Sequence, residues 1–549
     1  MNLANGLEQV IEYHEGTKHH LDRYARSLGY LDWANQPDPF RRYEGAPKVR
    51  LAHPDEADSP PYDDIFSPGK VPARSMDRAS VSRLFYDSLS LSAWKQTPGS
   101  DRWALRVNPS SGNLHPTEAY LICGPLAGIG EEPGIYHYSP VEHALERLFA
   151  LTMEEWSSLT GDNTSEVLFV ALTSIYWREA WKYGERAFRY CNHDVGHALG
   201  ALSLAAASLG WFGGLIETVS DDDLGRLLFL ESQDKSEAEH PDCLVMISTS
   251  MGSANVEIPS TLLQRLSRAE CLGQPNQLSK NHHPWPAIDQ VSELTRYSVA
   301  RPPTHKTFPK SGSPNPDAPG SSSMKARRLF RQRRSAVAMD PSGSIGRPAF
   351  FRIMARLTLG RMSVPFSLLP WSPLVSLLLF VHRVRELRAG VYLLIRDSDQ
   401  QSLLRASLRA EFLWKKPEGC PEDLDLFLLE EGDCRNAAKI VSCHQGIAAD
   451  GVFSLGMLSR FEPVLQENGA SFYRRLHWEC GLIGQLLYLE AEAAGIRGTG
   501  IGCFHDDLLH QFLGLEDRAW QTLYHFTVGK SLEDFRLQTI PAYEHLKRQ

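Results

Sequence analysis

The sequence lacks the cysteine patterns that mark a disulfide framework or a zinc site. Its nine cysteines are scattered along 549 residues with no CxxC pair, and no two Cys/His pairs have the spacing of a structural zinc site. In a chain this long, such usage is typical of reduced thiols in a cytoplasmic protein. We therefore expect a cytoplasmic protein with no bound metal.

Long apolar runs and an excess of positive charge are also missing. The most apolar stretch, residues 364–384, is broken by prolines and falls short of the ~20 clean residues that a membrane-spanning helix needs. The first residues have neither a basic segment nor an apolar run, so we expect no signal peptide and no membrane association. A net charge of −9 argues against a protein that coats nucleic acid.

Length and composition predict at least two domains. A single hydrophobic core rarely exceeds about 250–300 residues. Residues 301–323 are rich in Pro, Gly and Ser and hold too few large apolar side chains to offset their ordering entropy. The predicted organisation is an extended N-terminal arm with little secondary structure (1–60), a first domain (61–270), a linker (271–323) and a second domain (324–549).

The two predicted domains repeat each other. Residues 196–230 align without a gap on residues 481–515 at an offset of 285, with twelve identities in thirty-five positions, and the same offset pairs Arg189 with Arg474. Each copy reads as a buried helix, a glycine cap (Gly210 or Gly495), a short strand and a second helix. Strands are predicted at 119–123, 167–173, 213–217, 244–248, 391–395, 424–429, 499–503 and 522–528. Because helices and strands intermix without a βαβ rhythm, we predict an α+β fold.

The first motif with chemical content is the loop at residues 109–113, which reads Pro-Ser-Ser-Gly-Asn and precedes a predicted strand. Proline fixes the backbone, glycine permits close approach, and Ser110, Ser111 and Asn113 offer short hydrogen-bonding groups. Such a loop suits a flat polar ring system. The alternative is an ordinary Asx- or Ser-type turn that leads into the strand.

The second motif is basic. Six of the eleven residues from Lys325 to Ser335 are Lys or Arg, and clustered guanidinium groups beside a hydroxyl suit a phosphate. The alternatives are a solvated helix face and a nucleic-acid patch.

Two further stretches carry weaker signals. Residues 498–502 read GxGxG, which differs from the dinucleotide fingerprint and follows a helix instead of a strand, so the glycines are predicted to admit a ligand to the backbone amides. Cys443 and His444 are not expected to act as nucleophile and base, since neighbours on a strand point to opposite faces.

Together these stretches resemble the FMN-dependent nitroreductase superfamily, and within it the SagB/ThcOx-type dehydrogenases, which include azoline dehydrogenases acting on ribosomal peptides. Residues 109–113, with Pro116 and Glu118, are similar to the family's PSSxNxQP loop. Arg333, Arg334 and Ser335 are similar to its opening RRS motif. Its C-terminal flavin-contacting region is matched more loosely by Gly500, Ile501, Gly502, Lys530 and Arg536.

The resemblance implies how the motifs combine. Family dimers hold FMN at the subunit interface, with the PSS loop and the RRS motif supplied by different subunits. Here the first half has the PSS loop and no RRS, whereas the second half has RRS but reads PWSP at residues 370–373. We therefore expect two tandem nitroreductase-like domains that form an intramolecular pseudo-dimer with one complete FMN site. The second, pseudo-symmetric site should be empty or repurposed.

The resemblance also implies roles for single residues. Arg333, Arg334 and either Arg536 or Lys530 would offset the phosphate charge, and Ser335 would reach the ring edge or the ribityl chain. The loop residues Pro109, Ser110, Ser111 and Asn113 would contact the ribityl chain or ring, and the amides of Gly500, Ile501 and Gly502 would face the ring. Lys182 and Tyr183 are similar to a Lys-Tyr pair of azoline dehydrogenases and are the predicted catalytic pair. The alternative is an exposed Lys182 and a packed Tyr183.

Three functions follow from this resemblance. The first is FMN-dependent oxidation of an azoline-type ring in a peptide or of a small molecule. The second is reduction of nitro compounds or quinones, with NAD(P)H or O2 as a redox partner. The third is a non-catalytic scaffold in a peptide-modifying complex. The sequence does not identify the substrate.

Overall fold

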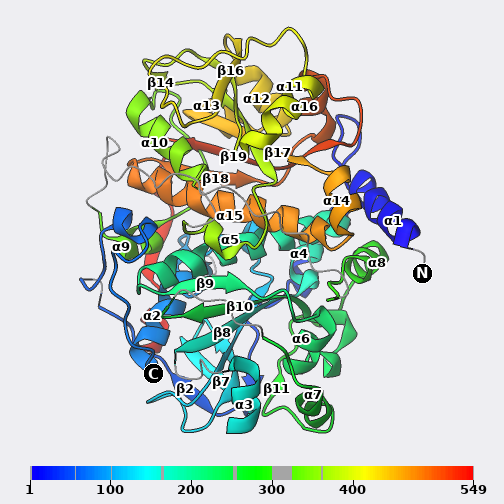
Figure 1. Cartoon of the computed structure of the whole chain (residues 1–549), viewed down its shortest axis with the longest axis vertical. Helices are drawn as coiled ribbons and strands as arrows, with labels where there is room; N and C mark the ends of the chain where they lie inside the picture. Colours follow the sequence, from blue (N-terminus) through cyan, green and yellow to red (C-terminus); the bar gives the residue numbers. More distant parts are fainter. Residues whose placement is uncertain are drawn as a thin grey trace.

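The computed structural model describes residues 3–55, 57–99, 102–161, 166–250, 256–299, 324–359 and 363–547. The first half is built on a seven-stranded sheet in the order β2-β7-β6-β5-β8-β10-β9, in which every neighbouring pair is antiparallel (Figure 1). Its strands are β2 (Lys48–Arg50), β5 (Thr117–Cys123), β6 (Gly134–Ser139), β7 (Ala144–Ala150), β8 (Val167–Ser174), β9 (Phe212–Leu215) and β10 (His240–Ser248).

The second half carries a six-stranded antiparallel sheet in the order β16-β15-β13-β17-β19-β18. Its strands are β13 (Val375–Val381), β15 (Gly390–Leu394), β16 (Leu426–Glu431), β17 (Phe453–Arg460), β18 (Arg497–Ile501) and β19 (Trp520–Gly529). The order β15-β13-β17-β19-β18 repeats the order β6-β5-β8-β10-β9 of the first half. The predicted α+β class and tandem repeat are therefore confirmed.

Two long helices, α5 (Ala187–Ala207) and α15 (Phe472–Ala493), pack against each other between the two sheets (Figure 1). All residues of α5 are buried, as expected for helices that are apolar on nearly every side. Gly210 and Gly495 follow the two helices with φ of 72° and 73°, the left-handed geometry that a glycine cap supplies.

Two equivalent ion pairs cross this interface in opposite directions, each joining an arginine of one half to an aspartate of the other. Arg189 binds Asp506 at 2.7 Å, and Arg474 binds Asp221 at 2.6 Å. Each arginine and each aspartate is displaced from its counterpart by 285 positions. The aspartates begin α6 (Asp221–Leu227) and α16 (Asp506–Leu513). Exchanged contacts of this kind define a two-fold relationship between the halves, as at an isologous dimer interface.

The N-terminal arm contains a helix, so the prediction of an extended arm was wrong for residues 3–16. Helix α1 (Leu3–Gly16) buries Val10 and Ile11 and packs against α8 (Pro286–Leu294) and α14 (Glu462–Asn468). Its Leu7, Val10 and Ile11 have the spacing of an amphipathic helix, a signal present in the sequence. His14 contacts Tyr473 and Gln521, both at 3.3 Å, which ties the arm to the second half.

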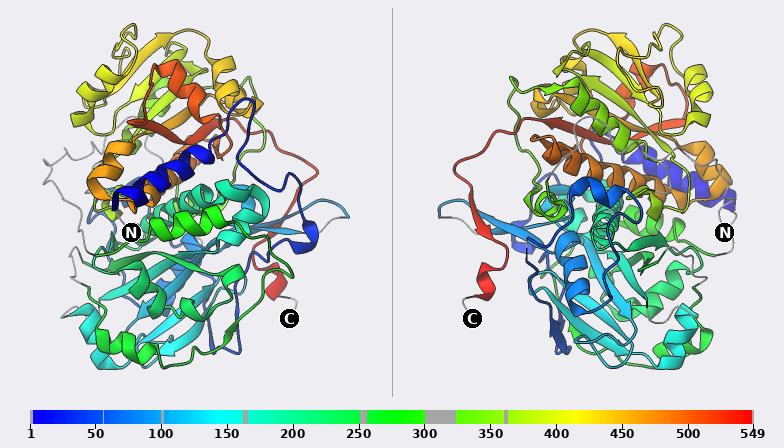
Figure 2. Two further views of the ribbon diagram at one scale, coloured as in Figure 1. Left: turned by 90° about the vertical axis from the view of Figure 1, so that its right-hand side faces the viewer. Right: turned by 60° about the vertical axis from the view of Figure 1, so that its left-hand side comes forward.

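The C-terminal segment returns to the first half. Strand β20 (Gln538–Pro541) pairs with β3 (Leu91–Gln96), which pairs with β4 (Trp103–Arg106). Figure 2 shows this segment in red, leaving the second half and ending beside the first. Each end of the chain thus packs on the opposite half: the N-terminal arm contacts the second half, and the C-terminal segment contacts the first.

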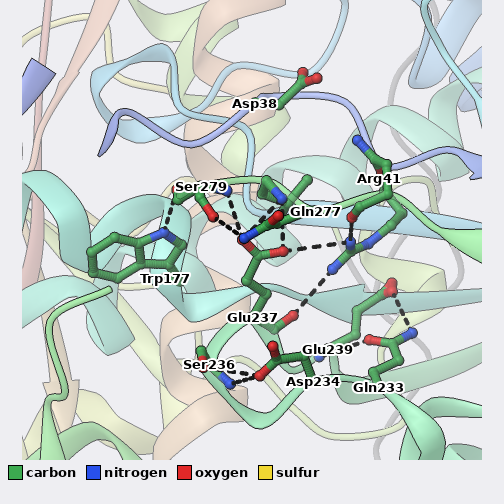
Figure 3. Close-up of polar contacts among 12 residues, drawn as sticks. Asp38, Arg41, Trp177, Gln233, Asp234, Ser236, Glu237, Glu239, Gln277 and Ser279 are labelled. Atoms are coloured by element: carbon green, nitrogen blue, oxygen red, sulfur yellow. Dashed lines mark hydrogen bonds and ion pairs between the residues drawn. The ribbon is translucent and has the colours of Figure 1, made fainter. Parts of the chain in front are cut away.

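The predicted linker is structured in its first part. Residues 274–275 form β11, which pairs with β1 (Tyr43–Glu44), whereas residues 301–323 lie outside the described ranges. Figure 3 shows the Glu237 carboxylate next to Ser279, in the part of the predicted linker that follows β11. The carboxylate accepts the backbone N–H groups of Leu278 (2.7 Å) and Ser279 (2.6 Å). A buried carboxylate with amide donors holds residues 276–282 to the first domain.

The remaining helices are α2 (Arg78–Ser88), α3 (Met153–Thr160), α4 (Tyr176–Tyr183), α7 (Ser260–Leu266), α9 (Ala326–Gln332), α10 (Arg347–Leu357), α11 (Gln401–Ser407), α12 (Arg435–Val441) and α13 (Gly446–Asp450), and the remaining strands are β12 (Ile345–Gly346) and β14 (Val384–Arg385). Among the helices of the described ranges, none has the length and apolar character to cross a bilayer.

Candidate functional site at the interface of the halves

The Pro-Ser-Ser-Gly-Asn loop lies on helices α4 and α5 of its own half. The backbone N–H and the Oγ of Ser111 donate to the carboxylate of Asp194, each at 3.0 Å. Ser110 Oγ accepts the backbone N–H of His115 at 2.8 Å and donates to Glu179 at 3.5 Å. These bonds fix the loop before β5 begins, so its shape is set by two helices and not only by local turn chemistry.

The two acids beneath the loop are buried and have raised pKa values. Burial raises the pKa of Asp194 to about 7, although the bonds from Ser110 and Ser111 oppose the shift. Burial, together with the nearby charge of Asp194, raises the pKa of Glu179 well above its ordinary value. The sequence analysis did not select either acid. Tyr190, Asp194 and His197 form a polar stripe at helical spacing on the apolar helix α5, and this stripe was the available signal.

The predicted catalytic pair borders the same loop. Gly112 is exposed and has φ of 58°, and a Cβ placed on it would lie 2.6 Å from Tyr183 Oη and 3.2 Å from Lys182 Nζ. Lys182 Nζ lies 5.1 Å from the centre of the Tyr183 ring. Burial raises the pKa of Tyr183, and Glu179 adds to the shift. Tyr183 packs against the core and lies 4.7 Å from the Tyr190 ring, as the alternative expected, whereas Lys182 is partly buried and not exposed.

The RRS motif of the second half reaches the first half here. Arg333 donates from Nε to the carbonyl oxygen of Val107 at 2.9 Å and from Nη2 to that of Arg106 at 3.1 Å. Arg334 donates from Nη1 to the carbonyl oxygens of Arg331 and Arg333 at 2.8 and 2.7 Å. Motifs that stand over 200 positions apart in the sequence therefore meet at one place.

The positive charge of the RRS motif is only partly offset, because Glu492, which accepts the Arg334 backbone N–H at 3.4 Å, acts on both arginines from a distance. Within the described ranges, no carboxylate lies within ion-pair distance of the guanidinium groups of Arg331, Arg333 or Arg334. Burial and the neighbouring Arg333 and Arg331 lower the pKa of Arg334 to about 10. The buried Nη1 of Arg333 has no hydrogen-bond partner. An anionic group such as a phosphate would satisfy both the charge and this donor.

Tyrosines occupy the space that the glycine stretch leaves. Gly500 donates its backbone N–H to Tyr488 Oη at 3.0 Å, and Ser335 Oγ lies 2.9 Å from the same oxygen. Tyr190 Oη donates to the Gly502 carbonyl at 3.0 Å, and a Cβ on Gly502 would lie 2.7 Å from the Tyr190 ring. The Gly500 amide is therefore taken by Tyr488 in this structure.

The remaining predicted residues differ in position. Ile501 is buried in the second half's core. Lys530 pairs with Asp340 at 3.0 Å, and Arg536, whose side chain is 83% exposed, pairs with Asp534 at 2.8 Å. Lys530 and Arg536 thus pair with acids that do not contact Arg333 or Arg334. Their role in binding the phosphate stays a prediction.

The pseudo-symmetric position is filled by side chains. Glu479, which matches Asp194, accepts the backbone N–H of Leu374 at 3.1 Å, so the loop–helix bond is repeated. Arg475 and Glu217, which match Tyr190 and Gly502, form a 2.7 Å ion pair. The Arg475 guanidinium also lies 5.3 Å from the Trp371 ring, and the cavity among these residues holds about 20 Å³.

Comparisons with known proteins agree with this architecture. The Nitroreductase family model matches residues 100–247 and 418–530, one region in each half. A nitroreductase-like protein of Methanocaldococcus jannaschii is 30% identical over 118 residues, which are 20% of this chain and 57% of that protein. The chain therefore spans little more than half the length of this relative.

Solved structures extend the likeness to the whole fold. A nitroreductase-like protein from Anabaena variabilis superposes with a TM-score of 0.66 at 20% identity, and the alignment covers 95% of this chain and 99% of that one. A nitroreductase-like protein from Exiguobacterium sibiricum in complex with FMN aligns at 14% identity over 38% of this chain and 88% of its own, with a TM-score of 0.22.

Proposed function

We propose that this chain is an oxidoreductase of the nitroreductase family that binds one FMN between its two halves. The observation that carries the proposal is the contact of Arg333 with the carbonyl groups of Val107 and Arg106, which brings the RRS motif across the interface to the backbone just before the PSS loop. At the matching position of the other half, the Arg475–Glu217 pair occupies the space.

The residues present fit this cofactor. Arg333 and Arg334 would bind the phosphate, because neither guanidinium group forms an ion pair with a carboxylate of the described residues. Ser110, Ser111 and Asn113 would bind the ribityl chain or ring from the first half, and Ser335 from the second. Bound FMN supplies two-electron hydride chemistry, and the protein supplies position and electrostatics.

We also propose that the substrate is an azoline-type ring in a peptide, which loses two electrons and two protons. The support is the position of Lys182 and Tyr183 beside the exposed Gly112. Lys182 Nζ would take the proton from the ring carbon, and Tyr183 Oη would orient the ring by hydrogen bonding. Glu179 and Asp194 hold the loop that carries Gly112 against helices α4 and α5, and α4 itself carries Lys182 and Tyr183.

Flavin stoichiometry tests the cofactor site. The purified full chain is denatured, and the released FMN is quantified against protein by absorbance and mass spectrometry. We expect one FMN per chain. Two per chain would contradict a filled second site, and a chain that neither retains nor takes up added FMN would contradict the proposal as a whole.

Anaerobic mixing separates the substrate classes. The FMN-loaded protein is mixed with an azoline-containing peptide or with NADPH or NADH, and the loss of the visible flavin absorption is followed. Bleaching by the peptide supports the dehydrogenase. Rapid bleaching by a nicotinamide nucleotide with no response to the peptide would overturn it in favour of a nitro or quinone reductase.

A further inference from the structure

Two cysteines from separate elements meet beside the site. Cys443 lies in the turn between α12 and α13, and Cys503 lies two residues beyond the end of β18. Gln445 donates from its side chain to the Cys503 carbonyl at 2.9 Å, and His505 donates its backbone N–H to the Val441 carbonyl at 2.9 Å, so the turn that carries Cys443 lies against Cys503. The two thiols interact, and both are partly exposed. Cys443 and His444 have φ of 52° and 58°, so they lie in a left-handed turn, and the strand geometry used to argue against a Cys443–His444 pair does not apply to them. This backbone geometry is uncommon outside glycine and positions Cys443 against Cys503.

The N-terminal arm contributes a histidine to this thiol pair. His19 Nδ1 accepts the backbone N–H of Ala25 at 2.9 Å, so the neutral ring carries its proton on Nε2. The His19 side chain hydrogen-bonds Cys503. The Cys443 thiol, His19 and the charge of Arg186 outweigh burial and lower the pKa of Cys503, whereas the pKa of Cys443 is raised. Arg186 donates to the carbonyl of Gly502, the residue before Cys503, at 3.3 Å, so the positive charge that favours a thiolate lies on the Cys503 side of the pair.

We propose that Cys503 and Cys443 form a peroxide-sensitive dithiol, with Cys503 as the attacking sulfur and Cys443 as the resolving thiol. An accessible thiolate with a second cysteine in contact is the arrangement of redox-sensing thiols. The Cys503 thiolate attacks one oxygen of hydrogen peroxide, the O–O bond breaks, and the hydroxide released takes up a proton to become water. Cys443 then attacks the Cys503 sulfenic sulfur and displaces the second water. The two thiols lose two electrons to form a disulfide, and peroxide is reduced to two waters.

The disulfide would act on the glycine stretch. Cys503 directly follows Gly502, whose carbonyl accepts the hydroxyl of Tyr190 and a weaker bond from Arg186 at 3.3 Å. Linking this point to the turn at Cys443 restrains the end of β18. The effect on cofactor binding rests on the proposed FMN site, whereas formation of the disulfide does not.

Mass spectrometry of the full chain tests the chemistry without reference to flavin. The reduced protein is treated with hydrogen peroxide, alkylated and digested. We expect a Cys443–Cys503 cross-linked peptide that is lighter by two hydrogens. In Cys443→Ser, dimedone should label Cys503, and Cys503→Ser should give neither product. Circular dichroism of each variant checks that it folds.

Other cysteines of the same chain serve as controls. Cys271 and Cys420 are also partly exposed, but burial raises the pKa of each to about 11, so we expect both to stay reduced. His19→Gln should slow the labelling of Cys503 several-fold. The proposal is overturned if Cys271 or Cys420 is oxidised as fast as Cys503, or if both thiols of the pair remain free. Either result leaves the FMN count, and so the proposed function, untouched.

Discussion

Gly196 of α5 and Gly481 of α15 face each other where the two helices cross. A Cβ placed on Gly196 would lie 2.8 Å from the Cα of Gly481, and one placed on Gly481 would lie 2.9 Å from the Cα of Gly196. The two glycines occupy equivalent positions of the repeat, at the offset of 285. Each also faces a backbone carbonyl of the other helix, that of Trp478 or of His193, and these carbonyls are equivalent as well.

The first prediction concerns this crossing. In Gly196→Ala the new methyl group meets backbone on the facing helix, so the helices must separate. We expect a loss of about 1–3 kcal/mol in the free energy of unfolding, even though alanine favours a helix by ~1 kcal/mol. Urea unfolding followed by fluorescence gives the value. The control is Gly214→Ala, whose Cβ would have no neighbour within 4 Å. Equal stability of Gly196→Ala and wild type would show that the crossing tolerates a side chain.

The second prediction concerns the pH dependence from Asp194. Its pKa is about 7 in the folded protein against an ordinary value of 3.8, so the folded state binds this proton more tightly. Stability from this group is therefore greatest in acid and falls as pH rises from about 4 to 7. Asp194→Asn keeps an acceptor for the Ser111 N–H and removes the ionisation. We expect a smaller loss of stability over that range, and a variant more stable than wild type above pH 7, measured by urea unfolding at each pH.

Asp506 provides the opposite control. Burial opposes its ionisation, but Arg186 and Arg189 outweigh burial and lower its pKa. Its contribution is present above the ordinary pKa and is lost as pH falls through the folded value. Asp506→Asn should cost about 3–5 kcal/mol at neutral pH, because it breaks a buried ion pair, and the cost should shrink in acid. Parallel pH profiles for the two variants would contradict both assignments.

The third prediction concerns the phosphate. Arg334→Gln removes one charge that has no ion-pair partner among the described residues, and charge-assisted hydrogen bonds contribute about 1.5–3 kcal/mol each. We therefore expect FMN to bind roughly tenfold to a hundredfold more weakly, measured by fluorescence titration of the apoprotein. The matched control is the double variant Arg475→Gln with Glu217→Gln, which removes the ion pair of the filled position. If the double variant lost FMN affinity as Arg334→Gln does, the assignment to one position would fail.

The fourth prediction concerns Lys182. Lys182→Gln keeps the length and a polar end but cannot take up a proton, so we expect kcat for the azoline peptide to fall about 10²- to 10⁴-fold. FMN content and peptide KM should change little. Tyr183→Phe should have a smaller effect, mainly on KM. Steady-state kinetics over a range of pH give both values, and unchanged kcat in Lys182→Gln would exclude it as the base.

Much of the fold could be predicted from the sequence because the chain contains two copies of one domain. The repeat predicted two domains, and the buried helices, glycine caps and the strands at 119–123 and 522–528 follow from local patterns. Strand β13 was not predicted. It is buried on both faces, so it has no alternation and was read as part of a broken apolar run. Helix α1 was missed although Leu3, Leu7, Val10 and Ile11 have helical spacing, because the whole N-terminal segment was interpreted as an extended arm.

The site was predictable only in part. Short motifs identified Ser110, Ser111 and Arg333, which the structure brings to one interface. Asp194 and Glu179 were not recognised, because one polar residue on a buried helix gains meaning only from what it faces. The Arg475–Glu217 pair joins positions that no motif links, and only the three-dimensional arrangement reveals that it fills the second position.

Because the two copies are joined in one chain, each can carry different residues at equivalent positions. When identical subunits associate, every substitution is made at both interface sites, so neither site can be lost without the other. Here glycine stands at position 502 and glutamate at its counterpart 217, and tyrosine stands at position 190 and arginine at its counterpart 475. One position can thus be given over to strengthening the interface while the other keeps a different set of side chains, and the association of the copies no longer depends on protein concentration.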